Sequence, residues 1–159
     1  MGNFSLKFDK FWETFIKYNG YVKVLEGLKN TLTIAVLGLI IGIVIGTLIA
    51  TARVIPQYKV LPRILNKICS FYVALFRGTP IVVQLLVFYY VLLPLMGSRM
   101  TGIQVAVMVF GLNSAAYISE IMRGGIMSVD SGQMEAGRAV GLSFGTTMLK
   151  IVIPQAVKN

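Results

Sequence analysis

Three polar side chains recur on one face of an otherwise apolar stretch. Asn113, Tyr117 and Glu120 follow one another at intervals of four and three residues, which places them together on a helix. Polar groups within a membrane face the protein interior or a water-filled path. This polar stripe therefore indicates either a path for a polar solute or hydrogen bonds between helices, and its spacing leaves both open. Gln84 and Gln104, in the same apolar runs, are further candidates for such a path.

The remaining composition restricts the available chemistry. The chain has no histidine and one cysteine, Cys69, which excludes an intrachain disulfide and a cysteine–histidine zinc site. General-base catalysis would fall to the six acidic residues, and these form no obvious buried pair. The phosphate-binding pattern G-x-x-x-x-G-K-[ST] is absent, so we expect any ATP hydrolysis to occur on a partner. We predict no enzyme, no metal and no cofactor.

Long uncharged runs dominate the 159 residues, of which 56% are hydrophobic. A helix rises about 1.5 Å per residue, and a membrane span must cross about 30 Å of hydrocarbon. We therefore predict an all-α, polytopic transmembrane bundle. The spans are expected at about 31–52, 75–96 and 102–122, with the start of a fourth at about 149–159.

The basic residues between these runs predict the orientation. Residues 53–67 carry four basic residues and no acid, 123–150 carry three, and 97–102 contain only Arg99. Because basic loops stay cytoplasmic, we place the first two segments inside and the third outside. Alternation then puts the N-terminus outside, although its five lysines argue against this. The net charge is +9, but we do not expect the chain to bind nucleic acid. Basic and aromatic residues do not alternate along it as they do in a groove that binds a single strand.

Residues 1–27 are expected to form a separate N-terminal segment. Four aromatic residues share one helical face, with lysines elsewhere; they are Phe8, Phe11, Trp12 and Phe15. This pattern is typical of a short amphipathic helix that lies in the membrane interface and contacts lipid. No small-residue cleavage site follows it, so we do not expect a removable signal peptide.

The second run is interrupted by Arg77, Gly78, Thr79 and Pro80. A charge at the membrane centre costs about 2.5–3.5 kcal/mol on insertion scales, so Arg77 is expected near the cytoplasmic end. Pro80 removes a backbone donor. We predict an amphipathic segment through about residue 74, followed by the crossing. Arg77 is either an interfacial anchor or a residue that orders the break.

Three glycines recur every four residues in the first run: Gly38, Gly42 and Gly46. Such a register leaves a smooth face on which another helix can approach closely. The alternative is that glycine is simply common in membrane helices.

Residues 128–154 read as helix, turn and helix. Asp130 or Ser131 can cap the first helix, Gly141 can end it with a positive φ, and Ser143 can cap the next, which Pro154 would bend. A short helix with small side chains suits either docking by a soluble partner or an ordinary connecting loop.

The stretch EAGRAVGLSFGTTMLKIVIP, residues 135–154, resembles the EAA loop of ABC-importer permeases, written E-A-A-x₃-G-x₉-I-x-L-P. The matching residues are Glu135, Ala136, Gly141, Ile151 and Pro154. Two positions depart from the motif, because Gly137 replaces the second alanine and Ile153 replaces leucine. The stretches FRGTPIVVQ (76–84) and 117–143 are similar to those of the polar amino-acid uptake permeases, the histidine and glutamine permease group.

This resemblance implies a type I ABC-importer transmembrane domain over 28–159 in a bacterial inner membrane, which imports polar amino acids by alternating access. It implies a second permease subunit, identical or related, two copies of an ABC ATPase and an extracytoplasmic amino-acid-binding protein. The cytoplasmic coupling loop is expected at about 124–148, with its helix at about 133–142. The residues assigned to ATPase coupling are Gln133, Glu135, Ala136, Gly137, Arg138, Gly141, Ile151 and Pro154.

Permeases of this group generally have about five spans, so the resemblance leads us to expect a truncated chain that does not transport alone. Two alternatives to an importer permease stay open. One is a non-transporting membrane subunit that only docks the ATPase. The other is a secondary carrier or channel driven by an ion gradient.

Overall fold

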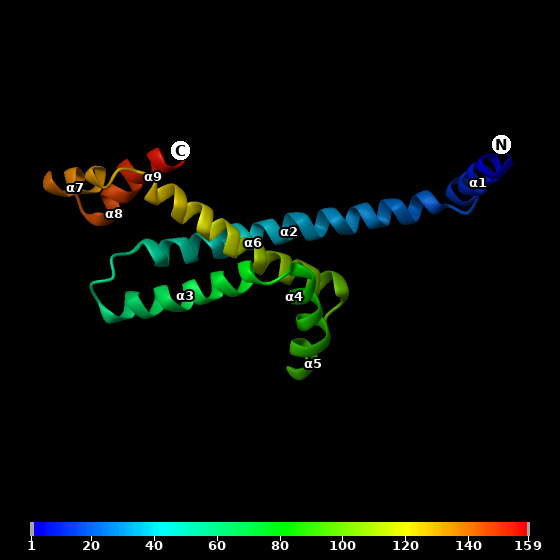
Figure 1. The fold of residues 1–159 in the computed structure, drawn as a ribbon, viewed down its shortest axis with the longest axis horizontal. Helices are drawn as coiled ribbons and strands as arrows, with labels where there is room; N and C mark the ends of the chain where they lie inside the picture. The colour runs from blue at the N-terminus through cyan, green and yellow to red at the C-terminus, as the bar shows by residue number, and fades with distance from the viewer. Residues whose placement is uncertain (1, 159) are drawn as a thin grey trace.

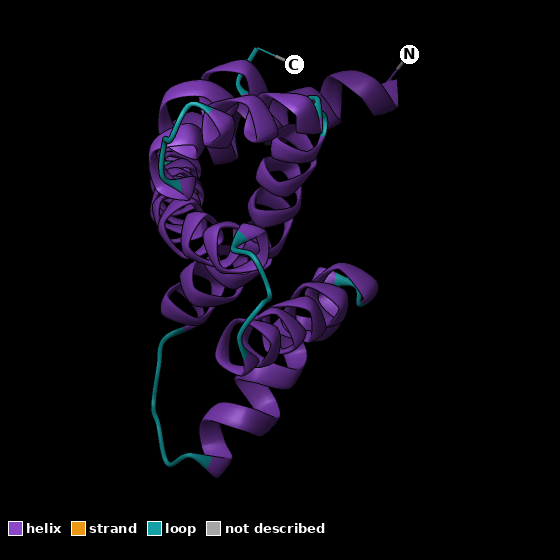
Figure 2. Cartoon of the chain, turned by 90° about the vertical axis from the view of Figure 1, so that its left-hand side faces the viewer, coloured by secondary structure: helices purple, strands orange, loops and turns teal. Residues whose placement is uncertain are grey.

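The computed structural model describes residues 2–158, with side chains from Phe4 onward, and over this range it contains helices and loops but no strand (Figure 2). Met1 and Asn159, the outer ends of the predicted segments 1–27 and 149–159, lie outside the described residues. The prediction of an all-α chain is confirmed. In chain order the elements are α1 (Gly2–Trp12), the π-helical η1 (Glu13–Lys17), α2 (Gly20–Val54), α3 (Val60–Gly78), α4 (Ile81–Val87), the π-helical η2 (Phe88–Leu92), α5 (Leu93–Leu95), α6 (Gly102–Met127), α7 (Ser131–Ala139), α8 (Phe144–Thr147), the π-helical η3 (Met148–Val152) and α9 (Ile153–Ala156).

Helices α2 and α6 form the central pair of the molecule (Figure 1). Both are long and apolar enough to cross a membrane, and they contain the predicted spans 31–52 and 102–122. Among the described residues a third candidate exists if α3 and the bent segment Ile81–Leu95 are counted as one broken span. The α2–α3 connection and α7–α9 lie at the same end of the molecule (Figure 1), as the predicted topology requires of its two basic loops.

The three spaced glycines of α2 form its contact with α6. Gly38, Gly42 and Gly46 are all buried. A Cβ atom at Gly42 would lie 2.6 Å from the Cβ of Ser114, and one at Gly46 would lie 3.0 Å from the carbonyl oxygen of Ala115. The two backbones are therefore too close for a side chain at Gly42, as in membrane helix pairs that rely on small residues.

The second predicted span differs from the expectation. Helix α3 has no boundary near residue 74 and continues to Gly78. The chain then bends by 107° into Ile81–Leu95. Residues 75–96 are therefore not one crossing helix. The α region is disfavoured for the residue before a proline, and Thr79 accordingly has an extended backbone, with φ −121° and ψ 143°, before Pro80.

The N-terminal segment is helical, as predicted, but it does not end at residue 27. Asn19, with φ +53°, separates η1 from α2, which then runs without interruption from Gly20. In α1, Phe8 and Trp12 stack with their ring centroids 6.4 Å apart, and both rings are more than half exposed. Contact of this face with lipid remains a prediction.

The predicted helix–turn–helix of residues 128–154 is present with shifted bounds. Asp130 caps α7 by accepting a hydrogen bond from the Gly132 backbone at 2.6 Å. The helix covers 131–139 rather than 133–142 and is terminated by Gly141, which has φ +84°. Ser143 accepts from the Thr146 backbone and caps α8. Pro154 lies in α9, directly after η3.

Candidate functional site at the end of helix α3

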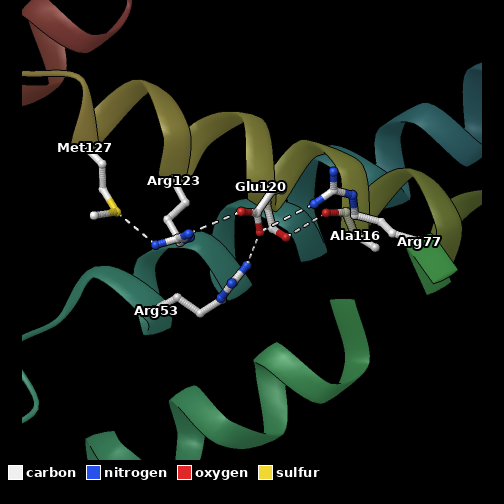
Figure 3. A network of polar contacts seen from close by, with 7 residues as sticks. Arg53, Arg77, Ala116, Glu120, Arg123 and Met127 are labelled. Carbon is white, nitrogen blue, oxygen red and sulfur yellow. Dashed lines mark hydrogen bonds and ion pairs between the residues drawn. The ribbon is translucent and has the colours of Figure 1, made fainter. Parts of the chain in front are cut away.

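Glu120 joins arginines from three helices (Figure 3). Its Oε2 lies 2.6 Å from the guanidinium of Arg53, in the last turn of α2, and 3.8 Å from that of Arg77, in the last turn of α3. Its Oε1 lies 3.3 Å from Arg123, one turn further along α6. Glu120 and Arg123 are thus an ion pair three positions apart on one helix. One carboxylate thus fixes α2 and α3 to α6.

The arginines around Glu120 are not fully compensated. Glu120 is the only acidic residue between positions 27 and 129, so three guanidinium groups against one carboxylate leave a net charge of +2. The Arg53 side chain is 10% exposed. The Nε atoms of Arg53 and Arg123 are buried and have no hydrogen-bond partner among the described residues. Buried charge without full pairing is costly, so this cluster favours an additional anion.

Gln84 bridges the bend between α3 and α4. Its amide nitrogen donates to the carbonyl oxygen of Phe76 at 2.8 Å and to the carbonyl and hydroxyl oxygens of Thr79 at 3.0 and 2.9 Å. These acceptors lie where the helical hydrogen bonds of α3 end, and helix ends must be satisfied by such partners. The predicted pathway residue Gln84 is 7% exposed and ties the bend together.

The polar stripe of α6 faces this bend. The Asn113 side chain donates to Gln84 Oε1 at 3.1 Å and to the Phe76 carbonyl at 3.3 Å. The Arg77 guanidinium lies over the ring of Tyr117, 5.5 Å from its centroid. Asn113 therefore joins helices, while Tyr117 orients the cation of the break.

An open pocket with both polar and apolar lining lies beside these residues, with a volume of about 510 Å³. This volume lies in the usual range of small-ligand sites. The break and the stripe both contribute to its lining, which consists of Arg77, Gly78, Thr79, Pro80, Ile81, Asn113 and Tyr117.

Gln104 lies apart from this site, in the first turn of α6, and its assignment to the pathway remains a prediction. Its Oε1 accepts from the Thr101 backbone at 2.9 Å, and Thr101 Oγ1 accepts from the Gln104 backbone at 3.4 Å. This reciprocal pair is a capping box that begins α6.

The residues assigned to ATPase coupling form a separate group on α7 and the segment after it. Gln133, Glu135, Ala136 and Arg138 are exposed, whereas Gly137 is buried against Thr147. Gln155 donates to Gln133 at 3.2 Å and ties α9 to α7. Gly141 ends α7, Ile151 is half-buried and Pro154 is exposed. The contact between Gly137 and Thr147 therefore holds α7 in place, with most of its other side chains exposed.

Sequence reasoning missed three residues that shape these sites. It treated Arg53 only as an orientation signal, yet Arg53 makes the shortest contact to Glu120. Tyr72 donates to the Leu112 carbonyl at 2.6 Å and fastens α3 to α6. Thr147 is fully buried against α7. Partners this distant in sequence leave no local pattern, whereas the Thr101–Gln104 spacing of the capping box was readable.

Comparison with known proteins shows the family to which this chain belongs. Residues 38–159 match the family described as "Binding-protein-dependent transport system inner membrane component". The chain belongs to this family. Membership agrees with helices long and apolar enough to span a membrane, and it confirms, at the level of the family, the resemblance seen in residues 135–154.

Relatives in the family include two bacterial permeases. The chain is 41% identical over 136 residues to the arginine transport system permease protein ArtQ of Bacillus subtilis, covering 86% of this chain and 60% of ArtQ. It is 38% identical over 149 residues to a putative glutamine transport system permease protein GlnP of Rickettsia bellii, covering 93% of this chain and 66% of GlnP.

A solved structure shares the fold. A crystal structure of an amino acid ABC transporter with histidines superposes with a TM-score of 0.77 at 33% identity, covering 92% of this chain and 65% of the other. The expected fold of an ABC-importer permease is therefore confirmed. The chain spans between 60% and 66% of the length of these three proteins.

Proposed function

We propose that this chain acts as a permease subunit of an ATP-driven importer for polar amino acids. The observation that carries the proposal is α7, a capped helix with exposed motif residues that packs against α8 and η3 and is joined to α6 by a short connection. Its position supports a role as the element through which a cytoplasmic ATPase moves the transmembrane helices. The names of the relatives, which concern arginine and glutamine, support an amino acid as the solute.

The residues of α7 divide into a docking face and a supporting face. Glu135, Ala136 and Arg138 are exposed, and the Val140 side chain that follows α7 is 77% exposed. This face offers small, apolar and charged groups together, as interfaces between subunits do. The other face is fixed by Gly137 against Thr147. A push on the docking face is therefore transmitted to the rest of the chain rather than absorbed by a loose loop.

The connection from α7 to the spanning helix α6 is short and packed. Only residues 128–130 separate the two helices. Helix α9 folds back on both, since Gln155 bonds to Gln133 and the Ala156 carbonyl would lie 3.3 Å from a Cβ atom at Gly125. Movement of α7 thus acts on the end of α6 that carries Glu120 and Arg123. Alternating access follows if this displacement opens and closes the path beside the polar stripe.

The proposed assembly contains a second permease subunit, two copies of the ATPase and an extracytoplasmic binding protein. ATP hydrolysis belongs to the ATPase, because this chain offers no phosphate loop. The chain lies in the inner membrane with residues 53–67 and 123–150 inside and the N-terminus outside, where α1 rests in the lipid interface.

Uptake of labelled glutamine, arginine and histidine by the native host tests the proposal. Disruption of the gene should remove uptake of at least one of them, and the natural gene should restore it. A gene with Glu135→Arg should restore little uptake. A gene with Glu26→Gln should restore uptake fully, because Glu26 is exposed and lies near the N-terminal end of α2, away from α7. The restored uptake should be inhibited by vanadate.

Two results would favour the alternatives. Vanadate-resistant uptake that stops when the ion gradient is collapsed would favour a secondary carrier. An ATPase that co-purifies with the chain, together with unchanged uptake after gene disruption, would favour a subunit that only docks the ATPase.

A further inference from the structure

Arg77 is the cation that Glu120 compensates least. The two oxygens of Glu120 are engaged by Arg53 at 2.6 Å and by Arg123 at 3.3 Å. Arg77 is 3.8 Å from the same carboxylate, which is longer than a hydrogen bond. Its side chain is also the most exposed of the three, at 42%. The excess positive charge of the cluster is therefore presented by Arg77.

The surroundings of Arg77 give this charge a fixed direction. The guanidinium rests over the Tyr117 ring, and both residues line the pocket of about 510 Å³ at the bend. An arginine fork held on an aromatic face is preorganised for a planar, bidentate anion. The two nearest arginines, Arg53 and Arg123, add positive potential from the side of Glu120.

The pocket also offers an acceptor for a cation. The amide nitrogen of Asn113 is committed to Gln84 and to the Phe76 carbonyl. The atom that Asn113 can present to a ligand is therefore its side-chain oxygen, which accepts hydrogen bonds. A receptor for an anion beside an acceptor for an ammonium group matches the two charged groups shared by all free α-amino acids.

We propose that this pocket binds the α-carboxylate of an amino acid, with Arg77 as the receptor cation. The identity of the solute rests on the proposed function, whereas the preference for a carboxylate rests on the charges and contacts around Arg77. Because every α-amino acid carries this group, Arg77 contributes affinity common to the substrates and does not select among their side chains.

Ligand-dependent stabilisation of the purified full chain in uncharged phosphatidylcholine nanodiscs tests this site. The probes are L-glutamine, L-arginine and L-histidine, each paired with its α-amide, in which the carboxylate is replaced by a neutral group. A ligand that binds the folded protein raises its Tm. We expect at least one free amino acid to raise the Tm and its α-amide to have little effect.

Variants of Arg77 identify the receptor. Loss of a hydrogen bond to a charged group predicts that Arg77→Gln weakens binding by about ten- to a hundredfold. Arg77→Lys, which keeps the charge but loses the fork, should retain intermediate affinity. Arg99→Gln removes a charge from the loop before α6 and should leave affinity unchanged.

A second variant separates loss of the ligand from loss of the fold. A Cβ atom at Gly78 would meet no atom within 4 Å, although Gly78 lines the pocket. Gly78→Leu should therefore fold and fill the space that the ligand needs. Gly27→Leu is the matched control, because Gly27 has the same open surroundings and lies outside the pocket.

The possible outcomes decide the proposal. Equal stabilisation by the α-amides, unchanged binding in both Arg77→Gln and Gly78→Leu, or no stabilisation by any of the amino acids would overturn it. Stabilisation by phosphatidylglycerol that depends on Arg77, without any effect of amino acids, would assign the pocket to a lipid headgroup and also overturn it. Vanadate-resistant uptake would contradict the importer while leaving Arg77-dependent binding intact, so the two proposals fail separately.

Discussion

The Thr147 side chain fills the space into which a side chain at Gly137 would point. A Cβ atom at Gly137 would overlap the Thr147 methyl group and lie 2.9 Å from its hydroxyl oxygen. Thr147 is fully buried, and its hydroxyl donates to the Ser143 carbonyl at 3.0 Å. The glycine that replaces the second alanine of the EAA motif is therefore matched to a threonine ten positions later.

This relationship predicts the effect of restoring the alanine. Gly137→Ala should lower the free energy of unfolding by about 1–3 kcal/mol, because Thr147 cannot move without disturbing a filled interior. Adding Thr147→Ala should recover part of the loss, since it removes both overlapping atoms. Thermal unfolding of the two single variants and the double variant measures the coupling. A neutral Gly137→Ala would show that the contact is not tight.

The glycine contact between α2 and α6 predicts a second pair of variants. Gly42→Ala brings a methyl group within 2.6 Å of the Ser114 Cβ and should destabilise the helix pair by about 1–3 kcal/mol. Gly27→Ala, in the same helix but without neighbours within 4 Å, should instead stabilise it by up to about 1 kcal/mol. Thermal unfolding in detergent compares them, and equal effects would contradict the predicted close approach.

Glu120→Gln should be among the most damaging single changes in the chain. It leaves three arginines without a carboxylate. Breaking a fully buried ion pair costs about 3–5 kcal/mol, and because the Glu120 side chain is 26% exposed we expect a smaller loss of stability, about 1–3 kcal/mol. The double variant with Arg53→Gln should lose less than the sum of the two single variants, because the most buried cation is then removed as well. If the double variant loses the full sum, Arg53 and Glu120 are not coupled.

Gln84→Leu should loosen the bend between α3 and α4. The change removes the donor to Thr79 and leaves the Phe76 carbonyl with only the 3.3 Å bond from Asn113. Each buried polar group left unsatisfied costs about 1–3 kcal/mol. Hydrogen exchange should accelerate in residues 79–87 while remaining slow in the α2–α6 pair. Asn113→Ala, which removes only a flanking donor, should have a smaller effect in the same place. Unchanged exchange in Gln84→Leu would show that Pro80 alone maintains the bend.

Local chemistry made much of this structure predictable. The caps at Asp130 and Ser143 and the stop at Gly141 depend on residues within a few positions of each helix end, so the sequence contains their whole cause. The spacing of Gly38, Gly42 and Gly46 likewise defines a smooth face. The sequence did not reveal which helix would cover that face.

The candidate site was less predictable because it depends on contacts between distant segments. Arg53 and Glu120 are 67 positions apart, and nothing near either residue distinguishes their contact from two unrelated charges. Pro80 predicted a break, but not a bend of 107°, nor that Gln84 would support it. Gln104 forms a capping box with Thr101, three positions earlier, and this local spacing is visible in the sequence.

Site-directed cross-linking from α7 tests the central claim most directly. Cys69 is the only cysteine, so Cys69→Ala gives a background in which Ala136→Cys, on the exposed face of α7, carries the only thiol. Gly27→Cys, on the first turns of α2, is the matched control. In native membranes, a cross-linker attached at position 136 should capture a protein whose peptides contain G-x-x-x-x-G-K-[ST], whereas one at position 27 should not. Equal capture from both positions, or capture from position 27 alone, would contradict the assignment of α7 as the ATPase-coupling helix.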